Sequence, residues 1–137
     1  MKKILTILLT LVLCVAVADA RKVPGDKVGV TFDSMIFDFG TVPSDTPALE
    51  HTYKMTVTGD SPVAILAATP SCGCTASDYP RKPAKPGETA DIKIVYHPGK
   101  KESGEQHKTV RLMLKNGKGK SETVTLRIVG VLVPPAK

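Results

Sequence analysis

The fold is decided by residues 110–128, which read VRLMLKNGKGKSETVTLRI. Apolar and polar side chains alternate on both sides of a polar, glycine-rich centre, the apolar ones being Val110, Leu112 and Leu114 before it and Val124, Leu126 and Ile128 after it. Such alternation predicts strands with one buried face, because successive side chains of a strand point to opposite faces. Asn116 and Gly117 form a turn signal between the two runs. The stretch therefore predicts a β-hairpin.

The same period of two recurs outward along the chain, in short runs bounded by Gly, Pro, Asp and Asn. No stretch keeps apolar residues at helical spacing over about three turns. The strand candidates are residues 28–32, 35–39, 51–58, 63–68, 92–96, 110–114 and 124–128, with residues 75–79 as a doubtful addition. Strands at this spacing predict an all-β fold, an immunoglobulin-like β-sandwich of about seven strands. We expect it to occupy residues 27–133 as one domain.

Residues 1–20 have the three-part layout of a secretory signal peptide. Lys2 and Lys3 supply the positive start, residues 4–17 form a nearly unbroken apolar run, and Ala18 and Ala20 offer the small side chains that a signal peptidase reads. We expect cleavage after Ala20 and export to the periplasm or the cell surface.

Two other interpretations of this segment are disfavoured. The apolar run is shorter than the roughly 20 residues that a helix needs to cross a bilayer, so we expect no membrane span in the mature chain. A lipid-modified cysteine normally follows a small residue, whereas Leu13 precedes Cys14.

The charge of the chain argues against a nucleic-acid partner. The sequence holds 19 Lys and Arg against 13 Asp and Glu, a net charge of +6. These basic residues are scattered, with modest concentrations at residues 81–85 and 115–120. Nucleic-acid binding would need a clustered basic face with aromatic side chains for stacking, and the chain contains no Trp. The composition predicts a solvated basic surface.

Cys72 and Cys74 are the two cysteines that remain after cleavage, one on each side of Gly73. In an exported protein they could form a disulfide, stay free and bind a soft metal, or merely fill space as a buried thiol pair. A disulfide across one residue closes a tight ring, which predicts easy reduction. It also constrains very little of the unfolded chain, so it would stabilise the fold only slightly.

His51 is the candidate third ligand of a metal held by Cys72 and Cys74. If the strands run up and down in antiparallel order, the turn at Gly59 sets His51 opposite about residue 70, beside the cysteine loop. Two thiolates and an imidazole suit Zn²⁺ or Cu⁺. The competing interpretation gives His51 an inward-facing packing role, hydrogen-bonded to nearby backbone.

His97 and His107 flank a later connection that is rich in Lys, Gly and Glu. That connection reaches the cysteine end of the sandwich only if residues 75–79 form a strand. Histidines in such a loop are ordinarily solvated.

The sequence offers no convincing enzyme site. Ser71 and Ser77 lack the strand–turn–helix context of a nucleophile elbow, and the acidic residues are dispersed rather than paired for acid–base work. Thiol–disulfide exchange is the one reaction with residues present to run it, but no helix is predicted whose N-terminus would activate a thiol. We expect a protein that is not an enzyme.

Several short motifs carry a resemblance to a known family. They are FDFGTV at residues 37–42, EHTY at 50–53, GDSP at 59–62, SCGCT at 71–75, PGE at 86–88 and IVGV at 128–131. Together they resemble the DUF1573 family of exported bacterial proteins, which is similar to the ASH and major-sperm-protein type of immunoglobulin-like domain. The resemblance implies the fold, and it leaves the activity open because a fold does not supply a function.

Two functions are compatible with these observations. The first is a non-enzymatic interaction or structural module that binds an unidentified protein partner, with exposed strand edges available for pairing. The alternative is a redox or metal-handling protein that uses Cys72 and Cys74 with Cu or Zn.

Overall fold

A computed structural model describes residues 23–136, which form eight β-strands and no α-helix. The strands are β1 (Val30–Phe32), β2 (Ile36–Pro43), β3 (Leu49–Val57), β4 (Val63–Pro70), β5 (Thr75–Asp78), β6 (Thr89–Tyr96), β7 (Gly104–Asn116) and β8 (Ser121–Val133). The prediction of an all-β sandwich is confirmed. The predicted signal peptide, residues 1–20, lies outside the described residues. Within residues 23–136 no helix has the length and hydropathy needed to cross a membrane.

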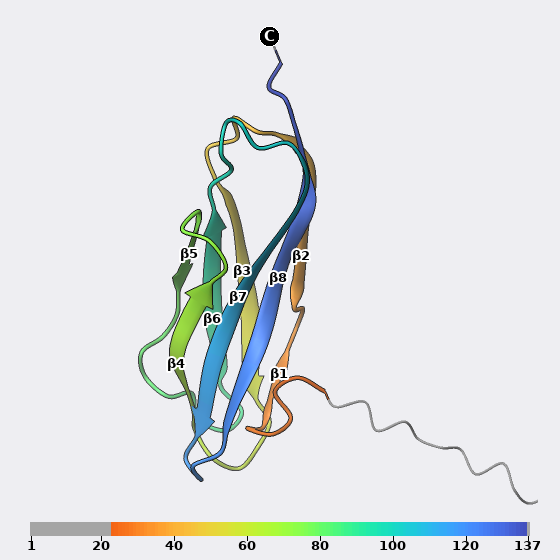
Figure 1. The fold of residues 1–137 in the computed structure, drawn as a ribbon. Helices are drawn as coiled ribbons and strands as arrows, with labels where there is room; N and C mark the ends of the chain where they lie inside the picture. Colours follow the sequence, from red (N-terminus) through yellow and green to blue (C-terminus); the bar gives the residue numbers. More distant parts are fainter. Residues whose placement is uncertain (1–22, 137) are drawn as a thin grey trace, which may run out of the picture.

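Two four-stranded sheets make up the sandwich (Figure 1). Sheet A has the strand order β1-β3-β6-β5, and sheet B has the order β2-β8-β7-β4. The inward-facing side chains of both sheets form one core, whose largest fully buried members are Tyr53, Tyr96, Met55, Ile92, Ile94, Leu112, Leu114, Leu126, Ile128 and Leu132. Tyr53 also ties the sheets together, because its hydroxyl donates to the carbonyl oxygen of Arg127 at 2.6 Å. Burial raises the pKa of Tyr53 to about 12.

The hairpin predicted from residues 110–128 is present as β7 and β8. Val110 lies opposite Leu126 and Leu112 opposite Val124, so the apolar residues of both strands share the core face. Both strands run further than predicted, because the outer parts pair with each other as regularly as the centre. At the turn the Asn116 side chain accepts the N–H groups of Lys118 and Lys120, at 3.1 and 2.9 Å.

The expectation of an up-and-down order of strands is wrong. β1 pairs with β3 in sheet A, and the chain then crosses to sheet B, where β2 runs parallel to β8. Asp33 makes this crossing: its carboxylate accepts the N–H of Ser34 at 2.7 Å and that of Lys54 at 2.9 Å. These bonds end β1 after three residues and turn the chain toward the other sheet.

The turn at Gly59 likewise joins two sheets rather than two neighbouring strands. β3 pairs with β1 and β6, whereas β4 pairs with β7. The prediction that His51 faces residue 70 across a ladder is therefore wrong, since the ladder partner of His51 is Ile94. The doubtful strand at residues 75–79 is real as β5, which is held by pairing with β6.

The motif FDFG at residues 37–40 anchors β2. Phe37 and Phe39 pack against the core, and Asp38 accepts the N–H of Gly40 at 2.8 Å, where the ladder with β8 shifts register. Gly40 has a φ of 70°, in the left-handed region that favours glycine. The Phe39 ring lies over Gly130 of β8, and a Cβ atom at Gly130 would come within 2.6 Å of the ring atom Cζ. The Phe39 ring of β2 thus occupies the space that a side chain at position 130 of β8 would need.

Candidate functional site

The cysteine loop connects β4 of sheet B to β5 of sheet A at one end of the sandwich. Backbone bonds fix both of its ends: the Ser71 N–H donates to the Thr109 carbonyl at 2.8 Å, and the His97 N–H donates to the Cys74 carbonyl at 2.8 Å. The Ser71 hydroxyl adds a bond from the Thr109 N–H at 3.0 Å. The loop is therefore anchored to both sheets.

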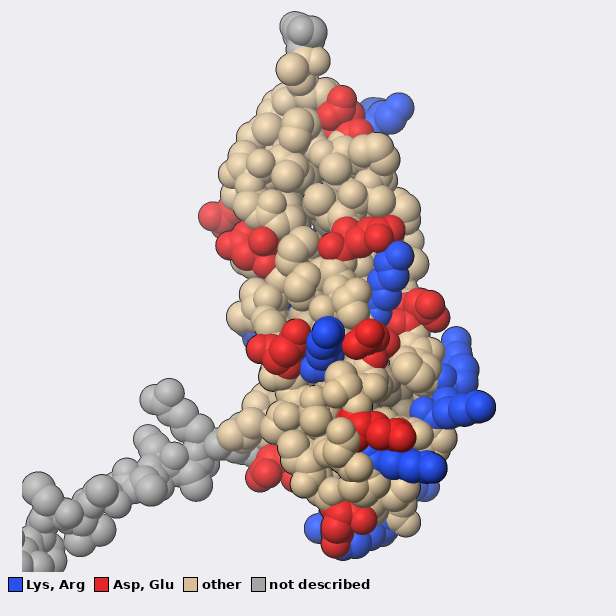
Figure 2. Space-filling view, turned by 180° about the vertical axis from the view of Figure 1, so that it is seen from behind, with Lys and Arg blue, Asp and Glu red and all other residues tan. Residues whose placement is uncertain are grey.

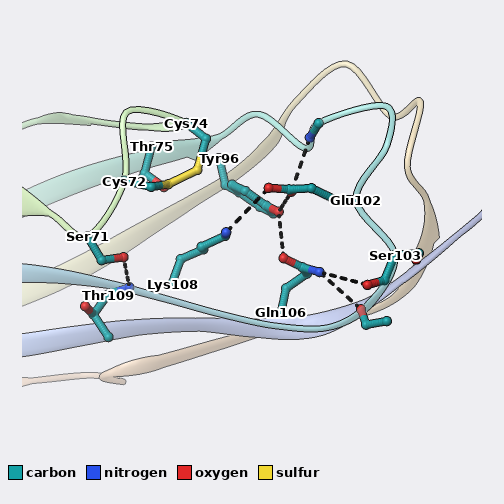
Figure 3. A network of polar contacts seen from close by, with 12 residues as sticks. Ser71, Cys72, Cys74, Thr75, Tyr96, Glu102, Ser103, Gln106, Lys108 and Thr109 are labelled. Atoms are coloured by element: carbon teal, nitrogen blue, oxygen red, sulfur yellow. Dashed lines mark hydrogen bonds and ion pairs between the residues drawn. A yellow bond between two sulfur atoms is a disulfide. The ribbon is translucent and has the colours of Figure 1, made fainter.

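A disulfide joins Cys72 and Cys74, with the two Cα atoms 5.3 Å apart (Figure 3). Both cysteines are half-buried, and Gly73 between them is exposed. The Thr75 hydroxyl lies 3.6 Å from the Cys72 sulfur and 3.9 Å from the Cys74 sulfur. Of the three states considered for the pair, the structure has the disulfide.

A polar network lies beside this loop at the end of the core (Figure 3). The buried Tyr96 hydroxyl donates to Glu102 at 2.7 Å and lies 3.4 Å from the Gln106 side-chain oxygen. Lys108 completes the group, with its ammonium 3.6 Å from Glu102 and 5.6 Å from the centre of the Tyr96 ring. The hydrogen bond from Tyr96 holds the pKa of Glu102 below its usual range, whereas burial raises the pKa of Tyr96 well above its own.

Replacing Tyr96 by Phe tests this network. We expect the free energy of unfolding at pH 7 to fall by about 1.5 kcal/mol, the low end for a hydrogen bond to a charged group, because Glu102 is partly exposed. The folded pKa of Glu102 is depressed, so its contribution is present above the unfolded carboxyl pKa near 4.5 and is lost as the pH falls through the folded value. Urea denaturation should therefore show a smaller difference between wild type and variant at about pH 2.5 than at pH 7. An equal difference at both pH values would contradict this role of Glu102.

His51 lies at the predicted end of the sandwich but away from the cysteines. β3 and β5 lie on opposite sides of β6, because Leu49 of β3 and Thr75 of β5 both pair with Tyr96. β6 therefore separates His51, on β3, from the cysteine loop, which leads into β5. The imidazole stacks on the Phe37 ring, with centroids 4.4 Å apart and planes within 9°. Its edge contact with Tyr53 is 4.6 Å between centroids. His51 thus packs among aromatic rings, and its buried Nε2 atom has no hydrogen-bond partner.

The two later histidines do come to the cysteine end, as the presence of β5 requires. The imidazole Nδ1 of His97 lies 3.1 Å from the Pro47 carbonyl oxygen, and the exposed His107 lies 3.9 Å from Glu105. Residues 23–136 contain no group of three or more His, Cys, Asp or Glu side chains placed to hold a metal ion. Metal binding by the reduced thiols stays a prediction.

The outer faces of the two sheets differ, and sequence reasoning did not single out this difference. An ion pair crosses the sheet A face between Lys93 and Glu50 at 3.1 Å, and Figure 2 shows side chains of both charges over much of this side. On sheet B, each strand instead carries one exposed large apolar residue, these being Ile36, Leu66, Met113 and Val133. One residue of this apolar surface could have been recognised in the sequence, because Met113 is an apolar residue at an outward-facing position of the alternating hairpin.

Comparison with solved structures supports the fold. The VesB protease of Vibrio cholerae aligns with a TM-score of 0.63 at 13% identity, over 75% of this chain and 32% of that one. A protein of unknown function from Porphyromonas gingivalis W83 aligns with a TM-score of 0.61 at 13% identity, over 75% of this chain and 46% of that one. PapD-like domain 7 of human CEP192, an ASH domain, gives 0.60 at 12% identity, over 80% and 89%.

These identities indicate a shared fold alone. The chain spans about a third of the Vibrio protease and about half of the Porphyromonas protein. A search of the curated proteins finds no match. The profile of the family described as "Protein of unknown function (DUF1573)" matches residues 30–132, which include every strand of the sandwich except the last residue of β8. The protein therefore belongs to the DUF1573 family.

Proposed function

We propose that this protein is an exported, non-enzymatic interaction module that docks a protein partner on the outer face of sheet B. The observation that carries the proposal is the distribution of exposed apolar side chains. Ile36 is 53% exposed and Met113 48%, and all four strand residues of this kind belong to sheet B, none to sheet A. An apolar surface concentrated on one face of a small domain is typical of a protein–protein contact.

Two of these side chains, Ile36 and Met113, border shallow depressions that adjoin one another. Ile36 lines one depression together with Thr123 and Thr125, and Met113 lines a second one that also includes Thr123. We call the surface formed by Ile36, Met113, Ala67, Thr123 and Thr125 the sheet B patch. Two arginines lie among these residues, because Arg127 is the ladder partner of Ile36 and Arg111 that of Thr125. Methionine and arginine are both enriched at protein–protein interfaces.

The non-enzymatic part of the proposal is supported by the polar network at Tyr96. The hydroxyl of Tyr96, the carboxylate of Glu102 and the ammonium of Lys108 bind one another, so each ionisable group already has a partner within the fold. Such a closed arrangement fits a structural role at the end of the core.

Photo-crosslinking in the native host tests the proposal. A photoreactive residue at Thr125 in the sheet B patch should give an adduct with another protein, and Met113→Lys in the same chain should abolish it, because a charge would be buried in the contact. The same probe at Asp91, on the outer face of sheet A, is the matched control and should give none. Equal adducts from both faces, or adducts made only of two copies of this chain, would overturn the proposal.

N-terminal sequencing of the mature protein from the same preparation tests the export. The chain should begin at Arg21, whereas a lipid-bearing Cys14 at the start would contradict the predicted cleavage.

A further inference from the structure

We propose a second binding site, separate from the sheet B patch: the first half of β3 accepts an extended, basic segment of a partner protein as an added strand of sheet A. β3 is nine residues long, but β1 pairs only with its last three residues, Met55 to Val57. Figure 1 shows β1 confined to the lower end of the sandwich while β3 continues upward. Within residues 23–136 no other strand lies along this side of β3.

We call the unpaired edge of the first half of β3, Leu49 to Tyr53, the opening. It ends at Lys54, whose two backbone groups both bond to Asp33: the Asp33 N–H donates to the Lys54 carbonyl at 3.1 Å, and the Asp33 carboxylate accepts the Lys54 N–H at 2.9 Å. Because alternate residues of a strand direct their backbone groups to the same side, those of Thr52 and Glu50 face the same side as those of Lys54. In the described part of the chain these groups of Thr52 and Glu50 have no hydrogen-bond partner. They form a template for a short strand antiparallel to β3, in line with β1.

The long edge strands of sheet B are blunted, in contrast to this opening. On β2, the Ser34 hydroxyl donates to the Ile36 carbonyl at 2.8 Å and accepts its N–H at 3.3 Å. On β4, Val63 and Ala84 exchange two backbone bonds of 2.9 Å, and the ladder with β7 shifts register next to Leu66. Capping side chains, bridges and bulges of this kind prevent strand addition. The first half of β3 carries none of them.

Half-buried aromatic rings lie under the opening. Phe37 comes from β2 and His51 from β3, and their stacked rings lie between the two sheets on this side of the core. An added strand would place its inward side chains over these rings, so the site favours apolar residues at alternate positions. The unpartnered Nε2 atom of His51 belongs to this same aromatic stack.

Charge identifies the kind of strand. Residues 33–53 form β2 and the first half of β3, and they contain Asp33, Asp38, Asp45 and Glu50 but no Lys or Arg. The chain as a whole has 19 Lys and Arg against 13 Asp and Glu. This segment is therefore acidic in a basic protein. Its basic neighbours are Lys54, which follows it on β3, Lys93, which is paired with Glu50, and Arg127, which lies opposite Ile36 on β8. A second copy would bring the same acidic segment, so a basic strand from another protein is the occupant that charge favours.

Peptide binding followed by amide hydrogen exchange tests the site. The probe is a short peptide that alternates Lys and Val, with one matched peptide alternating Glu and Val and another carrying Pro at the central Val. The basic peptide should bind best, and its binding should slow amide exchange at Glu50 and Thr52. The amides of His51 and Tyr53 should change little, because they already face β6.

Two variants separate this site from the rest of the surface. Thr52→Pro removes an N–H that faces the opening and should weaken binding of the basic peptide about five- to tenfold, as expected for one lost hydrogen bond. Glu50→Lys should also weaken it, without removing any backbone group. Met113→Lys should leave peptide binding unchanged, so failure of the sheet B patch and failure of this site are distinguishable.

Three outcomes would overturn the proposal: no binding of the basic peptide, binding that leaves exchange at Glu50 and Thr52 unchanged, or binding indifferent to both Thr52→Pro and Glu50→Lys. A dimer in solution whose Glu50 and Thr52 amides are already protected without peptide would assign the opening to a second copy instead.

Discussion

Replacing Leu112 by Ala should lower the free energy of unfolding by about 2–5 kcal/mol, the range for a buried leucine whose cavity does not collapse. Leu112 is fully buried, and it lies in the centre of β7 between the neighbouring strands β4 and β8. Close packing on all sides leaves little room for the neighbours to move into the space. Urea denaturation monitored by circular dichroism measures the effect directly.

The double replacement Cys72→Ser with Cys74→Ser is the control for this experiment. It removes the disulfide but should lower stability only slightly, because a bond that encloses one residue restricts the unfolded chain very little. The loop keeps its backbone bonds to Thr109 and His97 in either case. A double serine variant that fails to fold, beside a Leu112→Ala variant with normal stability, would show that core and loop have been assigned wrongly.

Gly130→Ala should cost about 1–3 kcal/mol, the usual range for overpacking a well-filled core. The added methyl group would overlap the edge of the Phe39 ring, including its atom Cζ at 2.6 Å. That ring has little freedom to move, since it lies 6.0 Å from the ring of Tyr96 and 6.5 Å from that of Phe37. Thermal and urea unfolding of the variant would measure the loss.

A double-mutant cycle identifies the cause of that loss. In the background Phe39→Ala the ring is absent, so adding Gly130→Ala should cost far less than it does in the wild type. If Gly130→Ala costs the same in both backgrounds, the penalty comes from the backbone of β8, and the contact with the Phe39 ring has no role.

The parts of the fold that depend on local pattern could be predicted from the sequence. Residues 110–128 alternate strictly on both sides of a short polar connection, so the two strands and their buried faces follow from the pattern. The register does not, because a two-residue turn at Asn116 and Gly117 would set Lys115 opposite Lys118, whereas the structure pairs it with Ser121. The parallel pairing of β2 with β8 could not be predicted, because it joins segments about ninety residues apart and depends on the bonds of Asp33 at the crossing. β5 was doubtful because a strand of four residues carries too little pattern to recognise.

The candidate sites show the same contrast between what local spacing predicts and what depends on long-range strand pairing. The proximity of Cys72 and Cys74 is given by their spacing, and the structure joins them. The place of His51 required knowledge of which strand pairs with β3, and the assumption of an up-and-down order gave the wrong neighbour. The network of Tyr96, Glu102 and Lys108 was missed because its members are separated by a loop, and only the folded connection brings them into contact.

The parallel pair of β2 and β8 has a mechanical consequence. β2 follows the start of the described chain and β8 precedes its end, and the two ends emerge at opposite ends of the sandwich (Figure 1). A force that pulls these ends apart acts on β2 and β8 in opposite directions along their length. The backbone bonds that join residues 36–43 of β2 to residues 127–133 of β8 then bear the force together, in shear, instead of breaking one after another. The molecule therefore resists extension along its long axis more strongly than peeling of β4 from the far edge of sheet B.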